Sequence, residues 1–288
     1  MSVGKNISLY LFNNTNSLNH NIFNFFYKTF VIKKNNYYKD YLENGFQKLK
    51  SINEKYILNI NKELNKQASS EKGTAYFELK LSKEIIEDIK KIVDDNLKED
   101  LKNLEKMYKS KCKLSHCKIV RNYHINQDSE VYSNFFHTDG YTLLMQKMFI
   151  NLDDIDMDKG PLEIIRKPLN KILKKKLGSN NYRLNLTTNK DDKFIYKNIG
   201  KKGDVLLCDT TTLLHKAGIP NKTFFRDVLF LEFVFNPNTN SNSENLNLFF
   251  EDSHYLDVDN ANSKKNAKIS TKIQLLNQLK NLIKKCLH

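Results

Sequence analysis

Three side chains in this sequence have the types and the spacing of a metal site. His137 and Asp139 are separated by one residue in FHTDG, residues 136–140. On a β-strand, residues i and i+2 point to the same face, so this imidazole and this carboxylate can reach one metal ion together. His215, at the end of GDVLLCDTTTLLH, is the candidate for a third ligand. Two histidines and one carboxylate form a facial triad, which holds Fe(II) and leaves positions open for a co-substrate and O2.

Arg226 follows the last of these residues by eleven positions and lies in the apolar run FRDVLFLEFVF. A guanidinium inside an apolar strand requires a charged partner. The far carboxylate of a co-substrate such as 2-oxoglutarate is one candidate. Simpler interpretations stay open for each residue. Arg226 could form an ion pair with Asp227 or Glu232. His215 could be a core histidine whose ring nitrogens are hydrogen-bonded within the protein, and HTD could be a hydrogen-bonded turn.

Three runs carry a resemblance to a known family: FHTDG, then GPL at residues 160–162, and GDVLLCDTTTLLHKAGIPN followed by Arg226. Together they resemble the phytanoyl-CoA dioxygenase family of Fe(II)/2-oxoglutarate oxygenases, over residues 117–236. The resemblance implies a double-stranded β-helix, a jelly-roll or cupin-like barrel. In it His137, Asp139 and His215 would bind Fe(2+), and Arg226 would bind 2-oxoglutarate. One departure is EIIRKPLNK after GPL, where the family often has a Pro-Gly-Ser-His-like turn.

The resemblance also implies a reaction. O2 would be the second co-substrate, 2-oxoglutarate would be converted to succinate and CO2, and a C–H bond of a small organic substrate would be hydroxylated. Related halogenases lack the carboxylate that Asp139 supplies, so this residue indicates hydroxylation. Strand residues that could face the substrate are Arg121, Tyr123, Tyr141, Gln146 and Lys147. Alternation places Gln146 and Lys147 on opposite faces, so at most one faces inward. Arg121 and Lys147 would favour an anionic or polar substrate, whose identity fold-level likeness does not fix.

Two other functions stay open: a non-catalytic jelly roll that acts as a binding module, and a lysine-rich nucleic-acid-binding protein. The formal net charge of +14 suits the second. Only four residues are arginines, however, and readers of phosphates and bases favour arginine forks. A lysine-studded surface is therefore the preferred interpretation. The four cysteines (Cys112, Cys117, Cys208 and Cys286) lack zinc spacing and are expected to be reduced thiols.

The expected fold class is α+β with a mainly β core, as a single domain over residues 1–288. Residues 1–116 would form a helical layer, 117–237 the jelly-roll core, and 238–288 a linker and a C-terminal helix. Ser82 has the type and position of a helix N-cap, with a break near Asn96. A short basic helix is expected at the start of residues 167–193. No apolar run is long enough to cross a bilayer, so we expect a cytoplasmic protein; the oligomeric state stays open.

Overall fold

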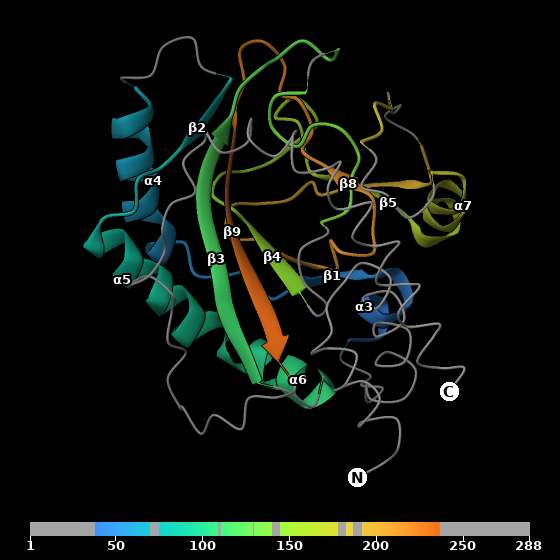
Figure 1. Ribbon diagram of the computed structural model, residues 1–288. Helices are drawn as coiled ribbons and strands as arrows, with labels where there is room; N and C mark the ends of the chain where they lie inside the picture. The colour runs from blue at the N-terminus through green and yellow to red at the C-terminus, as the bar shows by residue number, and fades with distance from the viewer. Residues whose placement is uncertain are drawn as a thin grey trace, which may run out of the picture.

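The computed structural model describes residues 38–69, 75–108, 111–128, 130–139, 145–177, 183–186 and 192–236. The linker and C-terminal helix expected in residues 238–288 lie outside these ranges. Within them the structure is mostly antiparallel sheet, with helices on one side of the larger sheet (Figure 1). No helix of the described residues is long and apolar enough to cross a membrane.

The larger sheet has six strands in the order β1-β7-β4-β9-β3-β2, every neighbouring pair antiparallel. Its strands are β1 (Phe46–Leu49), β2 (Tyr76–Glu78), β3 (Lys111–Asn122), β4 (Met145–Asn151), β7 (Val205–Cys208) and β9 (Arg226–Asn236). The long strand β9 lies between β4 and β3, which come from distant parts of the chain. A smaller sheet has the order β6-β5-β8, with β5 (Glu163–Ile165), β6 (Ile195–Lys197) and β8 (His215–Lys216).

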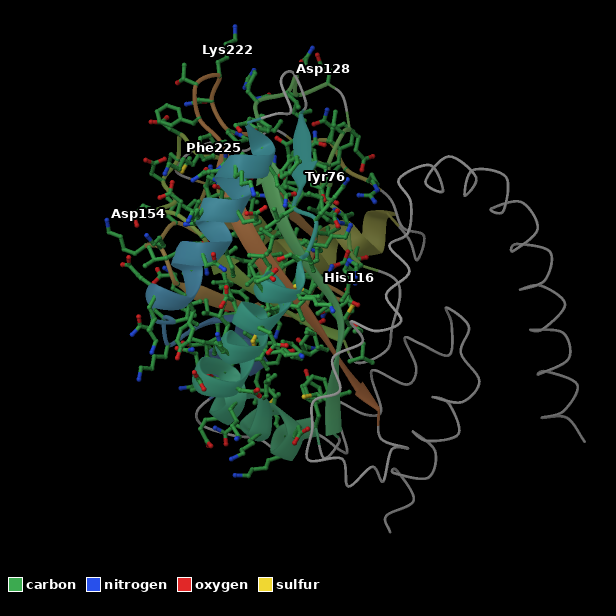
Figure 2. All side chains as sticks on the ribbon, turned by 90° about the vertical axis from the view of Figure 1, so that its left-hand side faces the viewer. Tyr76, His116, Asp128, Asp154, Lys222 and Phe225 are labelled. Carbon is green, nitrogen blue, oxygen red and sulfur yellow. The ribbon has the colours of Figure 1, made fainter. Side chains whose placement is uncertain are left out.

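The helical layer covers one face of the larger sheet (Figure 2). It consists of α4 (Lys55–Ala68), α5 (Lys83–Lys91), a π-helical segment η3 (Ile92–Leu97) and α6 (Lys98–Tyr108), while the short helix α3 (Lys39–Asn44) lies beside β1 (Figure 1). Apolar side chains of these helices share one core with the strand residues Met148, Ile150, Leu229 and Leu231. Burial of this apolar area provides most of the driving force that joins the two layers.

The Ser82 prediction is confirmed, because the Ser82 side chain accepts a hydrogen bond from the backbone N–H of Ile85. The break expected near Asn96 takes the form of the π-helical segment η3, so the helix continues from Lys83 to Tyr108 without a chain reversal. The helix expected after residue 167 is present as α7 (Lys167–Leu177).

The structure differs from the expectation of a purely helical segment up to residue 116. Strands β1 and β2 lie in that segment and form the two edges of the larger sheet, and β3 begins at Lys111. The strand geometry considered for His137 and Asp139 is not continuous over residues 130–139, EVYSNFFHTD. This run contributes only two isolated bridges, at Phe136 and His137. Ser133 within it has a φ of 37°, which a strand does not accommodate.

The two faces of the larger sheet differ in character. On β4, the residues Gln146, Met148 and Ile150 face the helices, whereas Lys147 and Phe149 face the smaller sheet. Phe149 packs against a second apolar cluster that includes Ile164 of β5. We call the side that carries Lys147 and Phe149 the inner face. The candidate site lies on this side.

Candidate metal centre

A reciprocal main-chain contact brings together the two histidines of the predicted metal site, whose three residues (His137, Asp139 and His215) we call the trio. The N–H of His137 donates to the carbonyl of His215 at 3.0 Å, and the N–H of His215 donates to the carbonyl of His137 at 3.0 Å. Residues paired in this way point their side chains to the same side. Their ring centroids are 4.5 Å apart. The backbone N–H of Asp139 donates to the carbonyl of Thr210 at 2.9 Å, which fixes the third member beside the other two.

The three side chains converge on one point. Asp139 Oδ1 lies 3.6 Å from His137 Nε2, and Asp139 Oδ2 lies 3.5 Å from His215 Nε2. One ligand atom from each residue can be chosen so that all three lie within 4.8 Å of one another. All three residues are buried. In the part of the chain that the structure describes, no other group of histidine, cysteine and carboxylate side chains meets this arrangement.

Hydrogen bonds to the backbone set the tautomer of both imidazoles. His137 Nδ1 lies 2.8 Å from the carbonyl oxygen of Phe135, and His215 Nδ1 lies 3.0 Å from that of Leu213. A carbonyl can only accept, so each Nδ1 carries the hydrogen and donates. In the neutral ring, Nε2 is then left with its lone pair directed toward Asp139. This is the tautomer that a metal-binding histidine needs.

The charges in the trio favour a cation. Burial lowers the pKa of His215 to about 4, so this ring is neutral at pH 7. Burial alone would raise the pKa of Asp139, but the Lys147 ammonium beside it helps to hold this pKa well below its usual range, so the carboxylate is ionised. Two imidazole lone pairs and a carboxylate therefore face one another. The chemistry of this donor set fits a divalent metal of the first transition row.

Arg226 opens β9 and is buried without an ion pair among the described residues. Its Nη1 donates to the carbonyl of Gly160 at 2.9 Å, while its buried Nε has no partner. Burial lowers its pKa to about 10. The two partners considered from the sequence are engaged elsewhere, because Asp227 is bound by Arg121 and Glu232 lies beside Lys147. A buried guanidinium N–H without a hydrogen-bond partner is available to donate to the carboxylate of a bound ligand.

The glycines at 160 and 218 allow the chain to form the turn that holds Arg226. Gly160 has a φ of +64°, and an added Cβ would lie 2.5 Å from the backbone of Ile219 and Pro220. Its carbonyl accepts the bond from Arg226. The GPL motif therefore has a local structural role, which is to bring one loop against another where the arginine is anchored.

Of the residues predicted to face the substrate, Lys147 is the one that the structure brings to the trio. Its Nζ lies 2.8 Å from Asp139 Oδ2. Gln146 faces the helices, where its Oε1 accepts a hydrogen bond from the hydroxyl of Tyr41. This agrees with the expectation that at most one of the two faces inward. Tyr141 lies outside the described residues.

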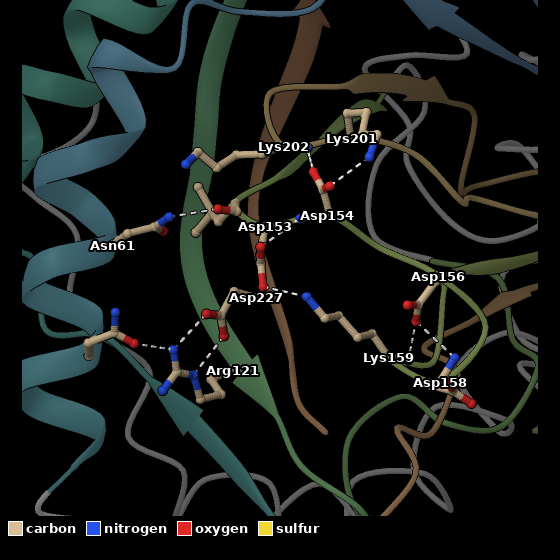
Figure 3. A network of polar contacts seen from close by, with 12 residues as sticks. Asn61, Arg121, Asp153, Asp154, Asp156, Asp158, Lys159, Lys201, Lys202 and Asp227 are labelled. Carbon is tan, nitrogen blue, oxygen red and sulfur yellow. Dashed lines mark hydrogen bonds and ion pairs between the residues drawn. The ribbon is translucent and has the colours of Figure 1, made fainter. Parts of the chain in front are cut away.

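The structure does not bring Arg121 to the trio. Its Nε and Nη2 donate to the two oxygens of Asp227 at 2.7 and 2.6 Å, and Nη2 also donates to Asn65 of α4 at 2.6 Å. The ring of Phe225 lies 3.9 Å from its Cζ. Figure 3 shows the guanidinium directed at Asp227. The contacts of Arg121 therefore join the sheet to the helical layer. Tyr123, likewise, has its ring beside Phe225.

Sequence reasoning named Glu232 only as a possible partner of Arg226 and did not single out Ser115. Glu232 lies directly opposite Lys147 in the β4–β9 pairing. The signal was available, because Glu232 is the only charged residue in the otherwise apolar run VLFLEFVF. Its actual neighbour depends on the strand register, which the sequence does not reveal.

A run of aspartates near the end of β4 also contains potential metal ligands. Asp154 pairs with Lys201 at 2.8 Å, and Asp153 pairs with Lys159 at 2.5 Å (Figure 3). Asp156 accepts backbone hydrogen bonds within its own turn. These carboxylates are thus occupied by lysines and by the main chain, and they do not converge as the trio does.

The predicted thiol state of the cysteines is confirmed for Cys112, Cys117 and Cys208, which are free. Cys286 lies outside the described residues.

No family model matches the sequence, and no curated protein matches it. Solved structures similar to this chain include HygX from Streptomyces hygroscopicus with nickel and 2-oxoglutarate bound, at 15% identity and a TM-score of 0.47, covering 67% of this chain and 83% of that chain. ThoJ, a non-heme monooxygenase, has 12% identity and a TM-score of 0.47, covering 68% and 76%. SnoN, a non-heme alpha-ketoglutarate-dependent epimerase from nogalamycin biosynthesis, has 10% identity and a TM-score of 0.45, covering 67% and 80%.

The resemblance to the phytanoyl-CoA dioxygenase family stays a prediction.

Proposed function

We propose that this chain is an Fe(II)- and 2-oxoglutarate-dependent dioxygenase that hydroxylates a C–H bond of a small organic substrate. The observation that carries the proposal is the trio itself, in which two Nε2 lone pairs and an ionised carboxylate face one another in a buried setting. The unpaired Nε of Arg226 adds the second requirement, which is a buried cation ready for the far carboxylate of the co-substrate.

The strand order supports the double-stranded β-helix that the sequence resemblance implies. Along the chain, β3, β4, β7 and β9 belong to the larger sheet, while β5, β6 and β8 belong to the smaller one. The bridge from His137 to His215 adds the segment before β4 to the smaller sheet. Consecutive segments therefore pass repeatedly from one sheet to the other, as in a jelly roll. The trio would lie where the two sheets approach each other.

Each residue has a defined task in the proposed reaction. His137, Asp139 and His215 would hold Fe(II), with the two Nδ1 hydrogen bonds keeping the rings in the binding tautomer. Arg226 would fix the far carboxylate of 2-oxoglutarate and so orient its keto-acid end toward the trio. When bound, the metal and 2-oxoglutarate supply the oxidising chemistry with O2, releasing succinate and CO2. The burial of the trio would exclude bulk water from that chemistry.

The test is an anaerobic titration of the protein with Fe(II) and 2-oxoglutarate, monitored by the metal-to-ligand absorption band of the complex. We expect the band in the wild type and its loss in His137→Ala and Asp139→Ala. Asp154→Asn is the control, because Asp154 is also a carboxylate but pairs with Lys201 at the surface and does not converge with the trio. A wild type without the band would refute the proposal.

Turnover separates an enzyme from a binding module that uses the same site. Succinate is measured after addition of O2, first without substrate and then with a library of small metabolites. Succinate formation above a metal-free control supports the dioxygenase, and stimulation by a library member identifies the substrate. A protein that shows the absorption band but forms no succinate under any condition is a binding module.

A further inference from the structure

The side chain of Lys147 lies between two carboxylates on the inner face of the larger sheet. Its Nζ is 2.8 Å from Asp139 Oδ2 and 3.6 Å from Glu232 Oε2. Lys147 and Glu232 are directly opposite each other in the β4–β9 pairing, so the second contact follows from the strand register. Both side chains are largely buried, at 14% and 17% exposure. One ammonium group is therefore shared between a proposed metal ligand and a second acid.

A β-bulge in the neighbouring strand holds Glu232 in place. The pairing of β3 with β9 shifts between Leu114 and His116, which leaves Ser115 as the extra residue. The Ser115 hydroxyl lies 2.8 Å from Glu232 Oε1 and 3.1 Å from the Glu232 carbonyl. Oε2 is thereby left facing Lys147. Bulges occur near active sites because they redirect a side chain in this way.

Electrostatics indicates what the shared ammonium does. Without a metal, the Asp139 carboxylate is buried against two imidazole lone pairs, an arrangement that is costly unless a cation is present. Lys147 supplies that cation. A bound dication would compete with Lys147 for the same carboxylate and would repel the ammonium at short range. Glu232 is then the acid toward which Lys147 can move.

We propose that Lys147 is a positioning residue of the metal centre: its ammonium neutralises Asp139 in the metal-free protein and is drawn to Glu232 when a divalent metal binds. The proposal rests on the metal site proposed above. A chain of three contacts crosses the sheet and ends at the proposed ligand, and we call it the relay. It runs from Ser115 of β3 to Glu232 of β9, then to Lys147 of β4, and finally to Asp139. This relay sets how much of the Asp139 carboxylate is available to the metal, and hence the affinity of the site.

The experiment measures the dissociation constant of Mn(II) by calorimetry, together with the Tm of the metal-free protein. In Lys147→Met, Mn(II) binding should tighten by about tenfold or more, because the ammonium that competes with the metal for Asp139 is removed. The Tm of the metal-free variant should fall, because Asp139 loses its counter-cation. A general loss of structure would lower both the Tm and the metal affinity, so shifts of opposite sign identify the positioning role.

The second arm tests whether Glu232 acts through Lys147. Glu232→Gln removes the alternative partner of the ammonium, so Mn(II) binding should weaken by about tenfold in the wild-type background. In the Lys147→Met background the same substitution should leave the affinity within about twofold. The matched control is Lys118→Met, because Lys118 is also a half-buried lysine of the larger sheet but pairs with Glu78 at 2.7 Å. Its Mn(II) affinity should equal that of the wild type.

Three results would overturn the relay. They are unchanged or weaker Mn(II) binding in Lys147→Met, an equal effect of Glu232→Gln in both backgrounds, and an effect of Lys118→Met as large as that of Lys147→Met. The second would mean that Glu232 acts on the metal directly by its charge. If the proposed metal site itself is wrong, neither the wild type nor any variant binds Mn(II). That outcome differs from all three results above.

Discussion

Replacement of Arg226 by methionine should make the ligand-free protein more stable and at the same time abolish binding of 2-oxoglutarate. Burial lowers the pKa of Arg226 from 12.5 to about 10. At about 1.4 kcal/mol for each tenfold change in an equilibrium constant, the folded state holds the charged guanidinium at a cost of about 3 kcal/mol. The group is charged in both the folded and the unfolded chain at pH 7, so the whole cost is present at neutral pH. It decreases only as the pH rises above about 10.

The substitution also removes the hydrogen bond from Arg226 to the carbonyl of Gly160, which costs about 1 kcal/mol. The net gain in the free energy of unfolding is therefore about 2 kcal/mol. In a domain of this size that corresponds to a rise in Tm of about 4 to 8 °C.

The assay is thermal unfolding with and without Mn(II) and 2-oxoglutarate. In the wild type, the co-substrate should raise the Tm of the metal-loaded protein, because a ligand stabilises the state that binds it. In Arg226→Met that increment should vanish although the starting Tm is higher. Arg183→Met is the control, since Arg183 forms a surface ion pair with Glu130 and should affect neither quantity by much. A variant that is less stable than the wild type and still responds to 2-oxoglutarate would refute the reasoning.

Other substitutions test the parts of the fold that position the site. Arg121→Met should lower the free energy of unfolding by about 3 to 5 kcal/mol, because Asp227 is left buried without its partner; Arg121→Met combined with Asp227→Leu should recover most of the loss in a urea titration. Ser82→Ala should lower it by about 1 kcal/mol as a shift of the urea midpoint at constant slope, and a change of slope instead would contradict a simple capping role. Gly160→Ala should cost about 3 kcal/mol or more and weaken 2-oxoglutarate binding, because its Cβ would meet the backbone of the adjacent turn; unchanged affinity would separate that turn from the site.

The residue types and the spacing of FHTDG could be recognised from the sequence because they are local, whereas the approach of His215 depends on its pairing with His137, 78 positions earlier. FHTDG places an imidazole and a carboxylate two residues apart, and the run that ends at His215 has the pattern of a strand leading to a ligand. The start of the helix at Ser82 and the basic helix after residue 167 are local features of the same kind. For these two helices, neighbouring residues alone indicate where the helix begins.

The role of Arg121 could not be predicted, because it depends on which residue lies opposite. Arg121 faces Asp227 in the β3–β9 pairing, more than one hundred residues along the chain. A shift of that register by one residue would have turned the two side chains to opposite faces. The same limit applies to Lys147 and Glu232. Alternation predicted that Lys147 and Gln146 face opposite ways, but only the register identifies Glu232 as the neighbour of Lys147.

Strands β1 and β2 were missed for a different reason. They have four and three residues, and β1 reads FQKL, which offers too few alternating positions to predict a strand. Their strand form depends on partners, since β1 pairs with β7 and β2 pairs with β3. Residues 130–139 show the opposite case. They include residues that favour strands, yet they form only isolated bridges, at Phe136 and His137.

The central place of β9 in the larger sheet has a consequence for the order of events during synthesis. β9 is the last described strand of the chain, yet it lies between β4 and β3. At about 5 to 20 residues per second, a ribosome needs several seconds to make the residues between Asp139 and the end of β9. Until then β3 and β4 each have an unpaired edge on the side that β9 will occupy. Chains released before β9 is made would therefore expose two strand edges that favour aggregation.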